Sequence, residues 1–153
     1  MKKHLSTVIL VLAFFTGLSL MLYPSVSDYI NSLHQSEAIA EYAENISEMD
    51  EEERERLRQE AIGYNSSLAA KENLWSLSDE EKNKYYQTLN INNNGVMSYI
   101  EIPKINCYLP VYHGTDEGVL QTSIGHIPGT SLPIGGENSH CVPSGHRGGH
   151  SAK

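Results

Sequence analysis

The sequence predicts a mainly β domain that follows a membrane-spanning helix and a helical region. Three observations lead to this fold class. The N-terminus carries a long uncharged run, the next segment is acidic with helical periodicity, and short alternating segments separated by Gly and Pro follow residue 95. Short strands with this punctuation are typical of an all-β barrel or sandwich. The chain has 153 residues, enough for one domain plus attachments, and we expect it to hold an incomplete barrel.

The charge of the chain is concentrated in one segment. The sequence has 19 acidic and 11 basic residues, a formal net charge of −8. Residues 28–60 contain eleven of these acids and three of the bases. Because no basic patch stands out, we expect no nucleic-acid partner. Cys107 and Cys141 match neither a disulfide framework nor a C-x-x-C metal site, and we expect no cofactor.

The N-terminus has the composition of a membrane anchor. Lys2 and Lys3 precede an uncharged run over residues 5–23, which as a helix spans roughly 28 Å, close to the hydrocarbon core of a bilayer. The lysines favour a cytoplasmic location for residues 1–4. We therefore expect a single-pass cell-membrane protein with most of its chain extracellular. A cleaved signal peptide is the alternative, because small residues follow at 25–27, although no A-x-A site is present.

Two regions are expected between the anchor and the strands. In residues 24–63 apolar positions recur at mostly three- and four-residue steps between acids, which predicts an acidic helical stalk that ends at Gly63. Residues 64–95 mix helix and loop. Within them Ser78 and Glu81 predict a capping box at the start of a short helix. Trp75, the single tryptophan, fits either a packing anchor or a plug over a cleft.

The β pattern begins near residue 96 and leads to a histidine between two glycines. Thr115 is expected to cap a short helix, and residues 125–136, rich in Gly, Pro, Ser and Thr, are expected to be loop. His146 is a candidate for acid/base chemistry, because imidazole titrates near neutral pH. The expected strands are residues 98–102, 105–112 and 139–143.

Several short segments, in order along the chain, resemble class C sortases, the pilin-polymerising transpeptidases of Gram-positive bacteria. Each segment is short, and their order and spacing make the resemblance specific. The last of them resembles the segment that bears the catalytic histidine of that family. The segments are Gly95–Ile105, Leu109–Thr115, Gly125–His126, Gly129–Pro133, Gly135–His140 and Ser144–Gly148.

The resemblance implies a fold and a reaction. It implies that residues 96–153 form the N-terminal part of a sortase β-barrel. In the family a cysteine thiolate attacks the threonyl carbonyl of an LPxTG-type sorting signal, and the amine of a pilin lysine or a cell-wall peptide resolves the thioester. A histidine acts as general acid/base, and an arginine stabilises the oxyanion. The implied partners are pilin or surface proteins with LPxTG-type motifs, and the membrane.

Only one catalytic residue of the family has a counterpart in this sequence. His146 matches the general acid/base, whereas the T-L-x-T-C segment of the nucleophile and the later arginine are absent. Cys141 is interpreted as a buried strand residue, Cys107 as core, and Arg147 as a structural part of the histidine motif. No Asp-Pro lid motif occurs, so Trp75 is the nearest candidate for a lid aromatic in the lid-like region 64–95.

Three functional hypotheses follow from these residues. The first is a membrane-anchored class C sortase that is truncated in this chain and inactive alone. The second is a non-catalytic membrane-tethered remnant or interaction protein. The third is a zinc module built on His140, His146 and His150, which Gly148 and Gly149 disfavour because they argue against a shared helical face.

Overall fold

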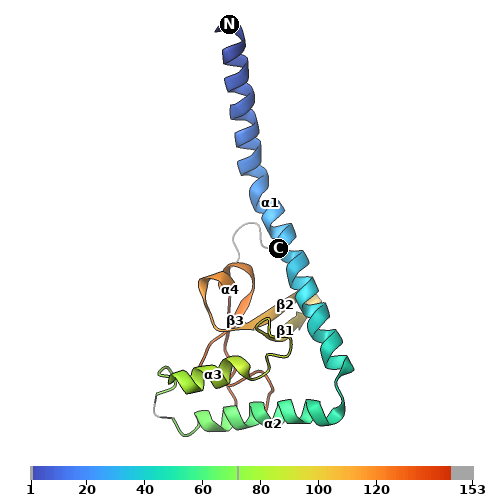
Figure 1. Ribbon diagram of the computed structural model, residues 1–153, viewed down its shortest axis with the longest axis vertical. Coiled ribbons are helices and arrows are strands. Elements are labelled where there is room, and N and C mark those ends of the chain that lie inside the picture. The colour runs from blue at the N-terminus through green and yellow to red at the C-terminus, as the bar shows by residue number, and fades with distance from the viewer. Residues whose placement is uncertain (1, 72, 146–153) are drawn as a thin grey trace. The chain divides into compact units, whose positions relative to one another are not determined.

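The structure is a computed structural model that describes residues 2–71 and 73–145, with side chains from residue 4 onward. The described residues form two compact units, one of residues 2–34 and one of residues 35–145. The first unit consists of the N-terminal part of helix α1, and the second contains the sheet and the remaining helices (Figure 1).

Helix α1 (Lys2–Glu48) contains the apolar run. Its most apolar 18-residue window has a mean hydropathy of 2.3, so the helix is long and apolar enough to cross a membrane by length and composition. The helix continues through Pro24. Proline removes one backbone donor from the helix interior but does not prevent helix on both sides of it.

The last turns of α1 belong to the second unit and bind it through polar contacts. The Tyr42 hydroxyl donates to the Met97 carbonyl at 2.8 Å, and Asn45 Nδ2 donates to Asn92 Oδ1 at 2.7 Å. The Gln35 side-chain amide also donates to the Thr122 carbonyl. This end of α1 is therefore fixed to the sheet-containing unit by hydrogen bonds.

Helix α2 (Glu51–Leu68) begins at a cap that was not expected from the sequence. Asp50 Oδ1 accepts a hydrogen bond from the Glu53 amide at 2.8 Å and provides the N-cap. The negative charges of three glutamates in the first turn interact favourably with the positive end of the helix dipole. The prediction of one helix that stops at Gly63 is wrong: the break falls before Glu51, and α2 runs past Gly63. Its buried face outweighs the cost of about 1 kcal/mol for a helical glycine.

Helix α3 (Asp79–Gln87) has the predicted capping box. The Glu81 amide donates to Ser78 Oγ at 3.3 Å, and the Ser78 amide donates to Glu81 Oε2 at 2.8 Å. Lys71 Nζ also lies 2.6 Å from Glu81 Oε1. The hydrogen bond from Lys71, followed by that from the Ser78 backbone, lowers the pKa of Glu81 to about 2.

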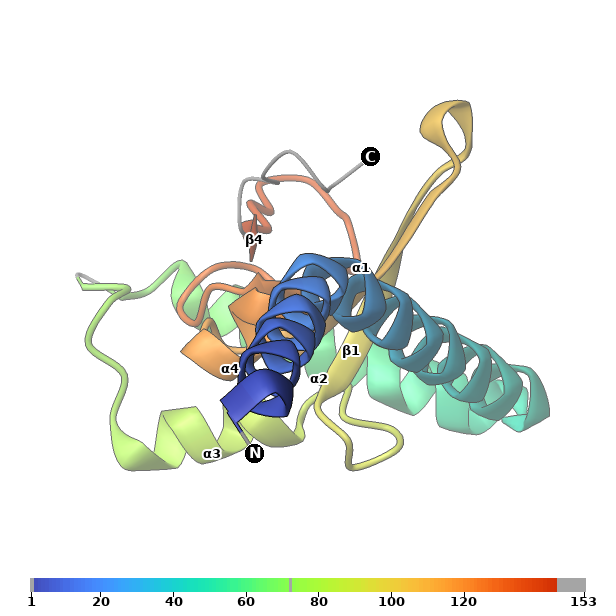
Figure 2. The same cartoon turned by 90° about the horizontal axis from the view of Figure 1, so that it is seen from above.

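The sheet is mixed and has the order β1-β2-β3-β4. Strands β1 (Val96–Ile102) and β2 (Cys107–His113) are antiparallel and joined through the 3₁₀ turn η1 (Pro103–Ile105), which Figure 2 shows extending from the sheet. Helix α4 (Glu117–Thr122) connects β2 to the parallel strand β3 (Ile124–His126). Strand β4 (Pro143–Gly145) pairs antiparallel with β3.

The structure corrects several details of the predicted β region. The cap of α4 is Asp116 and not Thr115, and residues 139–142 lie outside the strands, since β4 begins at Pro143. Residues 125–136 are not entirely loop, because β3 includes Gly125 and His126. A Cβ on Gly125 would overlap the Gly114 carbonyl oxygen, so this glycine permits close approach of two backbone segments.

The expectation of a mainly β chain needs correction as well. Helices α1 to α4 contain 47, 18, 9 and 6 residues, whereas the strands contain 7, 7, 3 and 3. Helix therefore prevails in the described chain, and the sheet is a partial one. The expectation of an incomplete barrel agrees with this partial mixed sheet.

The core of the second unit lies where α2 and α3 pack against the sheet. Figure 1 shows these two helices together below the strands. Three elements contribute large buried side chains: Tyr64 from α2, Tyr85 from α3 and Met97 from β1. Burial of such side chains contributes roughly 1.5–3 kcal/mol each. The complete core cluster is Ala61, Tyr64, Leu68, Tyr85, Leu89, Met97, Val111 and Leu132.

Candidate functional site

The candidate site begins at the strand that leads to the predicted catalytic histidine. In β4, Ser144 pairs with Gly125 and Gly145 pairs with Ile124, so β3 fixes the backbone up to the residue before His146. His146 and Arg147 lie outside the described residues. Their predicted roles, a general acid/base and a structural arginine, therefore stay predictions.

A buried hydrogen-bond network lies under the ends of β2 and β3. The Tyr85 hydroxyl from α3 is 3.0 Å from His126 Nδ1 and accepts from the Gly114 amide at 3.0 Å. His126 Nε2 lies 2.9 Å from the Ser131 carbonyl, so Nε2 carries the proton. The Tyr85 hydroxyl donates to the His126 carbonyl at 2.9 Å and faces the unprotonated Nδ1 as well. One phenol thus joins α3, the turn after β2, and β3.

The electrostatics of this network favour neutral groups. Burial lowers the pKa of His126, and the backbone hydrogen bond to Ser131 opposes this effect. Burial also raises the pKa of the Tyr85 hydroxyl. The His126 imidazole and the Tyr85 hydroxyl are therefore both uncharged at neutral pH. Its place in the core indicates a structural role.

A second buried histidine connects α3 to the start of β1. His113 Nε2 lies 2.8 Å from the Thr88 carbonyl, and Nδ1 lies 3.0 Å from the Gly95 carbonyl. The His113 ring also makes an edge contact with Tyr85, with centroids 5.1 Å apart. Both ring nitrogens contact backbone oxygens, so His113 is engaged in holding the strand ends.

Among the described residues, nothing indicates that either cysteine is activated as a nucleophile. Both are unpaired and partly buried. Burial raises the pKa of the Cys141 thiol, which disfavours the thiolate that catalysis requires. Cys141 precedes β4 and does not lie in a strand, but its partial burial agrees with a packing role. Cys107 is the first residue of β2, where it pairs with Ile102.

Trp75 lies on the segment between α2 and α3 and is 73% exposed. The interpretation as a packing anchor does not match this exposure. The Trp75 amide donates to Asn73 Oδ1 at 3.0 Å. The neighbouring Leu74 backbone lies so close to Gly129 that a Cβ there would overlap the Leu74 carbonyl oxygen. The segment that carries Trp75 is therefore held by a close backbone contact, while the indole remains accessible.

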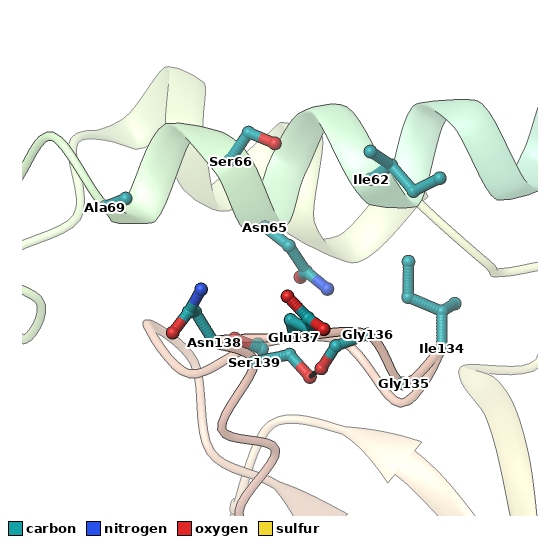
Figure 3. Close-up of a pocket in the computed structure, with 11 residues that line it drawn as sticks. Ile62, Asn65, Ser66, Ala69, Ile134, Gly135, Gly136, Glu137, Asn138 and Ser139 are labelled. Carbon is teal, nitrogen blue, oxygen red and sulfur yellow. Dashed lines mark hydrogen bonds between the residues drawn. The ribbon is translucent and has the colours of Figure 1, made fainter.

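Two adjoining clefts run between α2 and the loop that follows β3. The first, of about 360 Å³, lies between α2 and residues 134–139 (Figure 3). The second, of about 370 Å³, has Leu74 and Trp75 in its lining. The two clefts share Asn65, Ala69, Ser131 and Asn138 in their linings, so they lie side by side. A concave surface of this kind, with apolar walls and a few polar groups, suits a ligand.

The zinc hypothesis finds no support in the part of the chain that the structure describes. No group of three or more His, Cys, Asp or Glu side chains suited to a metal ion occurs among these residues. His140 lines the second cleft, whereas His146 and His150 lie outside the described residues.

Three residues that organise this region were missed by sequence reasoning. His126 was expected only as part of a loop, although it lies at the centre of the buried network. Gly129 was expected to be an ordinary loop glycine, whereas its φ of +87° and its contact with Leu74 require glycine. Asn65 pairs with both backbone groups of Leu132, from 67 residues away, and no local pattern could have revealed that contact.

Comparison with known proteins relates part of this chain to the sortases. Residues 100–153 match the sortase domain. The sequence is 46% identical to Sortase D of Bacillus subtilis (strain 168) over 48 residues, which are 31% of this chain and 23% of that protein. Residues 100–153 of this sequence thus resemble a sortase domain.

Solved structures specify the class of sortase that the chain resembles. Sortase C1 of Streptococcus agalactiae matches with a TM-score of 0.70 and 45% identity, over 76% of this chain and 60% of that one. Sortase C of Streptococcus pneumoniae, whose published structure is described as giving insight into pilin substrate specificity, matches with a TM-score of 0.59 and 37% identity. The match covers 76% of this chain and 58% of that one. The chain therefore resembles class C sortases. It spans about three fifths of the length of these relatives.

Proposed function

We propose that the chain is the N-terminal part of a membrane-anchored class C sortase, a cysteine transpeptidase that joins pilin subunits or surface proteins through LPxTG-type sorting signals. The observation that carries the proposal is the position of His146 directly after β4 within a sortase fold. The pilin substrate is carried over from the S. pneumoniae relative. The sortase fold and the class C relatives support a cell-surface site of action.

In this proposal the chain is divided by function. Residues 5–23 cross the membrane from a cytoplasmic segment 1–4, and residues 24–63 form the acidic stalk, of which residues 35–63 also pack within the sheet-containing unit. Residues 64–95 form the lid-like region, with Trp75 as its aromatic, and residues 96–153 supply the first part of the barrel. Support comes from the apolar helix α1, the glutamates at the start of α2 and the exposed indole.

His146 is the residue of this chain that would move protons in the reaction. A cysteine thiolate attacks the threonyl carbonyl, the Thr–Gly bond breaks, and the imidazolium donates its proton to the leaving amine. In the second half of the reaction the lysine amine attacks the thioester carbonyl, and the neutral imidazole takes a proton from this amine. The amide bond forms and the cysteine thiolate is released. The sequence contains neither the T-L-x-T-C segment nor the later arginine, so we expect the chain to be inactive alone.

A chimera tests this proposal. The chain is fused after Lys153 to the cysteine- and arginine-bearing part of S. agalactiae sortase C1, and an LPxTG peptide is mixed with a lysine amine. We expect amide product from the chimera, no product from the unfused chain, and loss of product in the His146→Ala chimera. Product from the unfused chain, or an active His146→Ala chimera, would refute the assignment.

A non-catalytic membrane-tethered interaction protein is the second candidate. The observation that favours it is the open sheet: in the described chain, β1 and β4 each pair with a strand on one side only. Unpaired strand edges invite pairing with another chain. An inactive chimera, together with a stable complex between the unfused chain and a separate barrel fragment, would favour this candidate.

A further inference from the structure

Helix α1 bears an apolar stripe that continues past the apolar run of residues 5–23. From Leu22 onward, large apolar side chains recur at steps of four, three and four residues, and each is between 48% and 65% exposed. We call these residues the α1 stripe: Leu22, Val26, Tyr29 and Leu33. Alternating steps of four and three residues are the spacing of a left-handed coiled-coil seam. The same alternation runs back into the apolar run through Ser19, Phe15, Leu12, Val8 and Leu5.

Beyond residue 23 the helix is apolar on one side only. Polar residues occupy most positions between the members of the stripe: Ser25, Ser27, Asp28, Asn31 and Ser32. Ile30 flanks the stripe and widens its apolar surface. A helix surrounded by lipid is apolar on all sides, whereas a single apolar side packs against protein. Residues 24–33 therefore present a surface for a protein partner.

The far end of the stripe lies beyond the reach of lipid. Leu33 follows Tyr23 by a helical length of about 15 Å. The headgroup region extends only about 5–8 Å past the hydrocarbon core on each side. A tilt of about 20°, the average for membrane helices, still leaves Leu33 about 14 Å from the core. The membrane that holds residues 5–23 therefore does not cover Leu33.

The stripe does not use the side of α1 that is bound by hydrogen bonds to the sheet-containing unit. Those bonds are made by Gln35, Tyr42 and Asn45. Successive residues of an α-helix are rotated by about 100°, so the mean direction of these three side chains is about 180° from that of the stripe. The contacts that fix the end of α1 and the contacts that the stripe offers are therefore on opposite sides of the helix.

A second copy of this chain has the properties that such a partner needs. Every copy that enters the membrane with Lys2 and Lys3 on the cytoplasmic side presents the same stripe at the same height and in the same direction. Between residues 24 and 36, Asp28 is the only acidic or basic residue, and it lies about 130° from the centre of the stripe. Two stripes can therefore meet in register without like charges in the contact.

We propose that α1 binds a second copy of this chain through the α1 stripe, as a parallel coiled coil that begins within the membrane and extends to Leu33. Ser19 lies in the membrane part of the seam, where small polar residues let helices approach closely and hydrogen-bond. Val26 is β-branched and occupies an a position of the heptad, which favours two strands. The proposal goes beyond the proposed function and uses only the retained anchor from it.

Disulfide cross-linking of the full chain in isolated cell membranes tests the seam. Both native cysteines are first replaced by serine. Val26→Cys and Leu33→Cys then place single cysteines in the stripe, whereas Asp28→Cys and Asn31→Cys place them on the other side of the helix. We expect the two stripe variants to form a disulfide-linked pair of chains about tenfold faster than the other two. Equal rates on both sides, or disulfides to other proteins only, would overturn the proposal.

Sedimentation equilibrium of the full chain in density-matched micelles measures the strength of the seam. Leu33→Glu places a carboxylate in the contact of each copy, and we expect it to raise the dissociation constant of the dimer about tenfold. Asn31→Glu adds the same charge on the opposite side and is the matched control, so its dissociation constant should equal that of the parent chain. A monomeric parent chain, or equal effects of the two substitutions, would reject the stripe as the contact.

These outcomes are distinct from those of the chimera test. An active chimera whose stripe cysteines do not cross-link would remove the seam and leave the transpeptidase assignment intact. Cross-linking that is specific to the stripe, together with an inactive chimera, would leave the seam and remove that assignment. Cleavage of the chain near residues 25–27 would separate Leu22 from the rest of the stripe and overturn the seam.

Discussion

At the scale of single residues, the Tyr85 hydroxyl connects α3 to two other segments of the buried region. It accepts from the Gly114 amide at 3.0 Å and lies 3.0 Å from His126 Nδ1. Tyr85→Phe keeps the ring and leaves both partners unsatisfied in the core. We expect a loss of about 1–3 kcal/mol in unfolding free energy, measured by denaturant unfolding of the full chain in micelles.

Tyr86→Phe is the matched control for this substitution. Tyr86 follows Tyr85 on α3 but is 41% exposed. Water can therefore reach this side chain, and removal of its hydroxyl leaves no buried partner unsatisfied. We expect less than about 0.5 kcal/mol of change. Equal effects of the two substitutions would show that the buried network contributes nothing specific to stability.

His126 gives the same network a pH dependence. Burial holds the pKa of the folded-state imidazole below its ordinary value of 6.5. Just below pH 6.5 the unfolded chain therefore binds more protons than the folded chain, and the unfolding free energy decreases as pH falls. The decrease ends once the pH is below the folded-state pKa.

NMR of the His126 ring measures this effect directly. We expect the midpoint of its titration in the folded chain to lie below 6.5, with Nε2–H as the neutral form. A midpoint at or above 6.5 in the folded chain would contradict the assignment of His126 as a neutral, buried support.

At the scale of elements, the segment between α2 and α3 is held at Gly129. The glycine has a φ of +87°, and a Cβ there would overlap the Leu74 carbonyl oxygen. Gly129→Ala should therefore release this segment from the loop. We expect trypsin to cleave after Lys71 about tenfold faster than in the parent chain, as followed by mass spectrometry.

Gly135→Ala controls for backbone strain without the clash. Gly135 also has a positive φ, +70°, but a Cβ there meets nothing within 4 Å. Gly135→Ala should therefore introduce backbone strain without a clash, and the rate of trypsin cleavage after Lys71 should stay unchanged. If both variants accelerated cleavage equally, the contact between Leu74 and Gly129 would not be what restrains the segment.

At the scale of the whole molecule, the apolar part of α1 predicts how the chain is retained in cells. We expect expressed protein to stay in the membrane fraction during alkaline carbonate extraction, and its intact mass to correspond to residues 1–153. Cleavage near residues 25–27 and release of the remainder would instead identify a signal peptide. The mean hydropathy of 2.3 in α1 is compatible with both interpretations, so the mass decides between them.

Local chemistry made parts of this protein predictable from sequence. The capping box of α3 depends on side chains three residues apart, and the strands on either side of Pro103 follow from local alternation. The sortase resemblance arose from ordered short segments, and the sortase-domain match over residues 100–153 confirms it. Each of these features is encoded by residues near one another in the chain.

Features that depend on distant contacts escaped sequence reasoning. Strand β3 contains Gly125, whose local sequence is typical of loop but which allows two backbone segments to approach each other. Helix α2 passes Gly63 because burial of Tyr64 and Leu68 outweighs a weak local propensity.

The sequence by itself determined the apolar helix, the capped helix, the first two strands and the candidate histidine, because periodicity and short-range chemistry define each of them. Only the tertiary structure decided that His126 supports the strands from within the core, that Leu74 rests on Gly129, and that a cleft lies beside α2. The physical reason is that burial and close approach are properties of residues brought together from distant positions, and no local pattern records them.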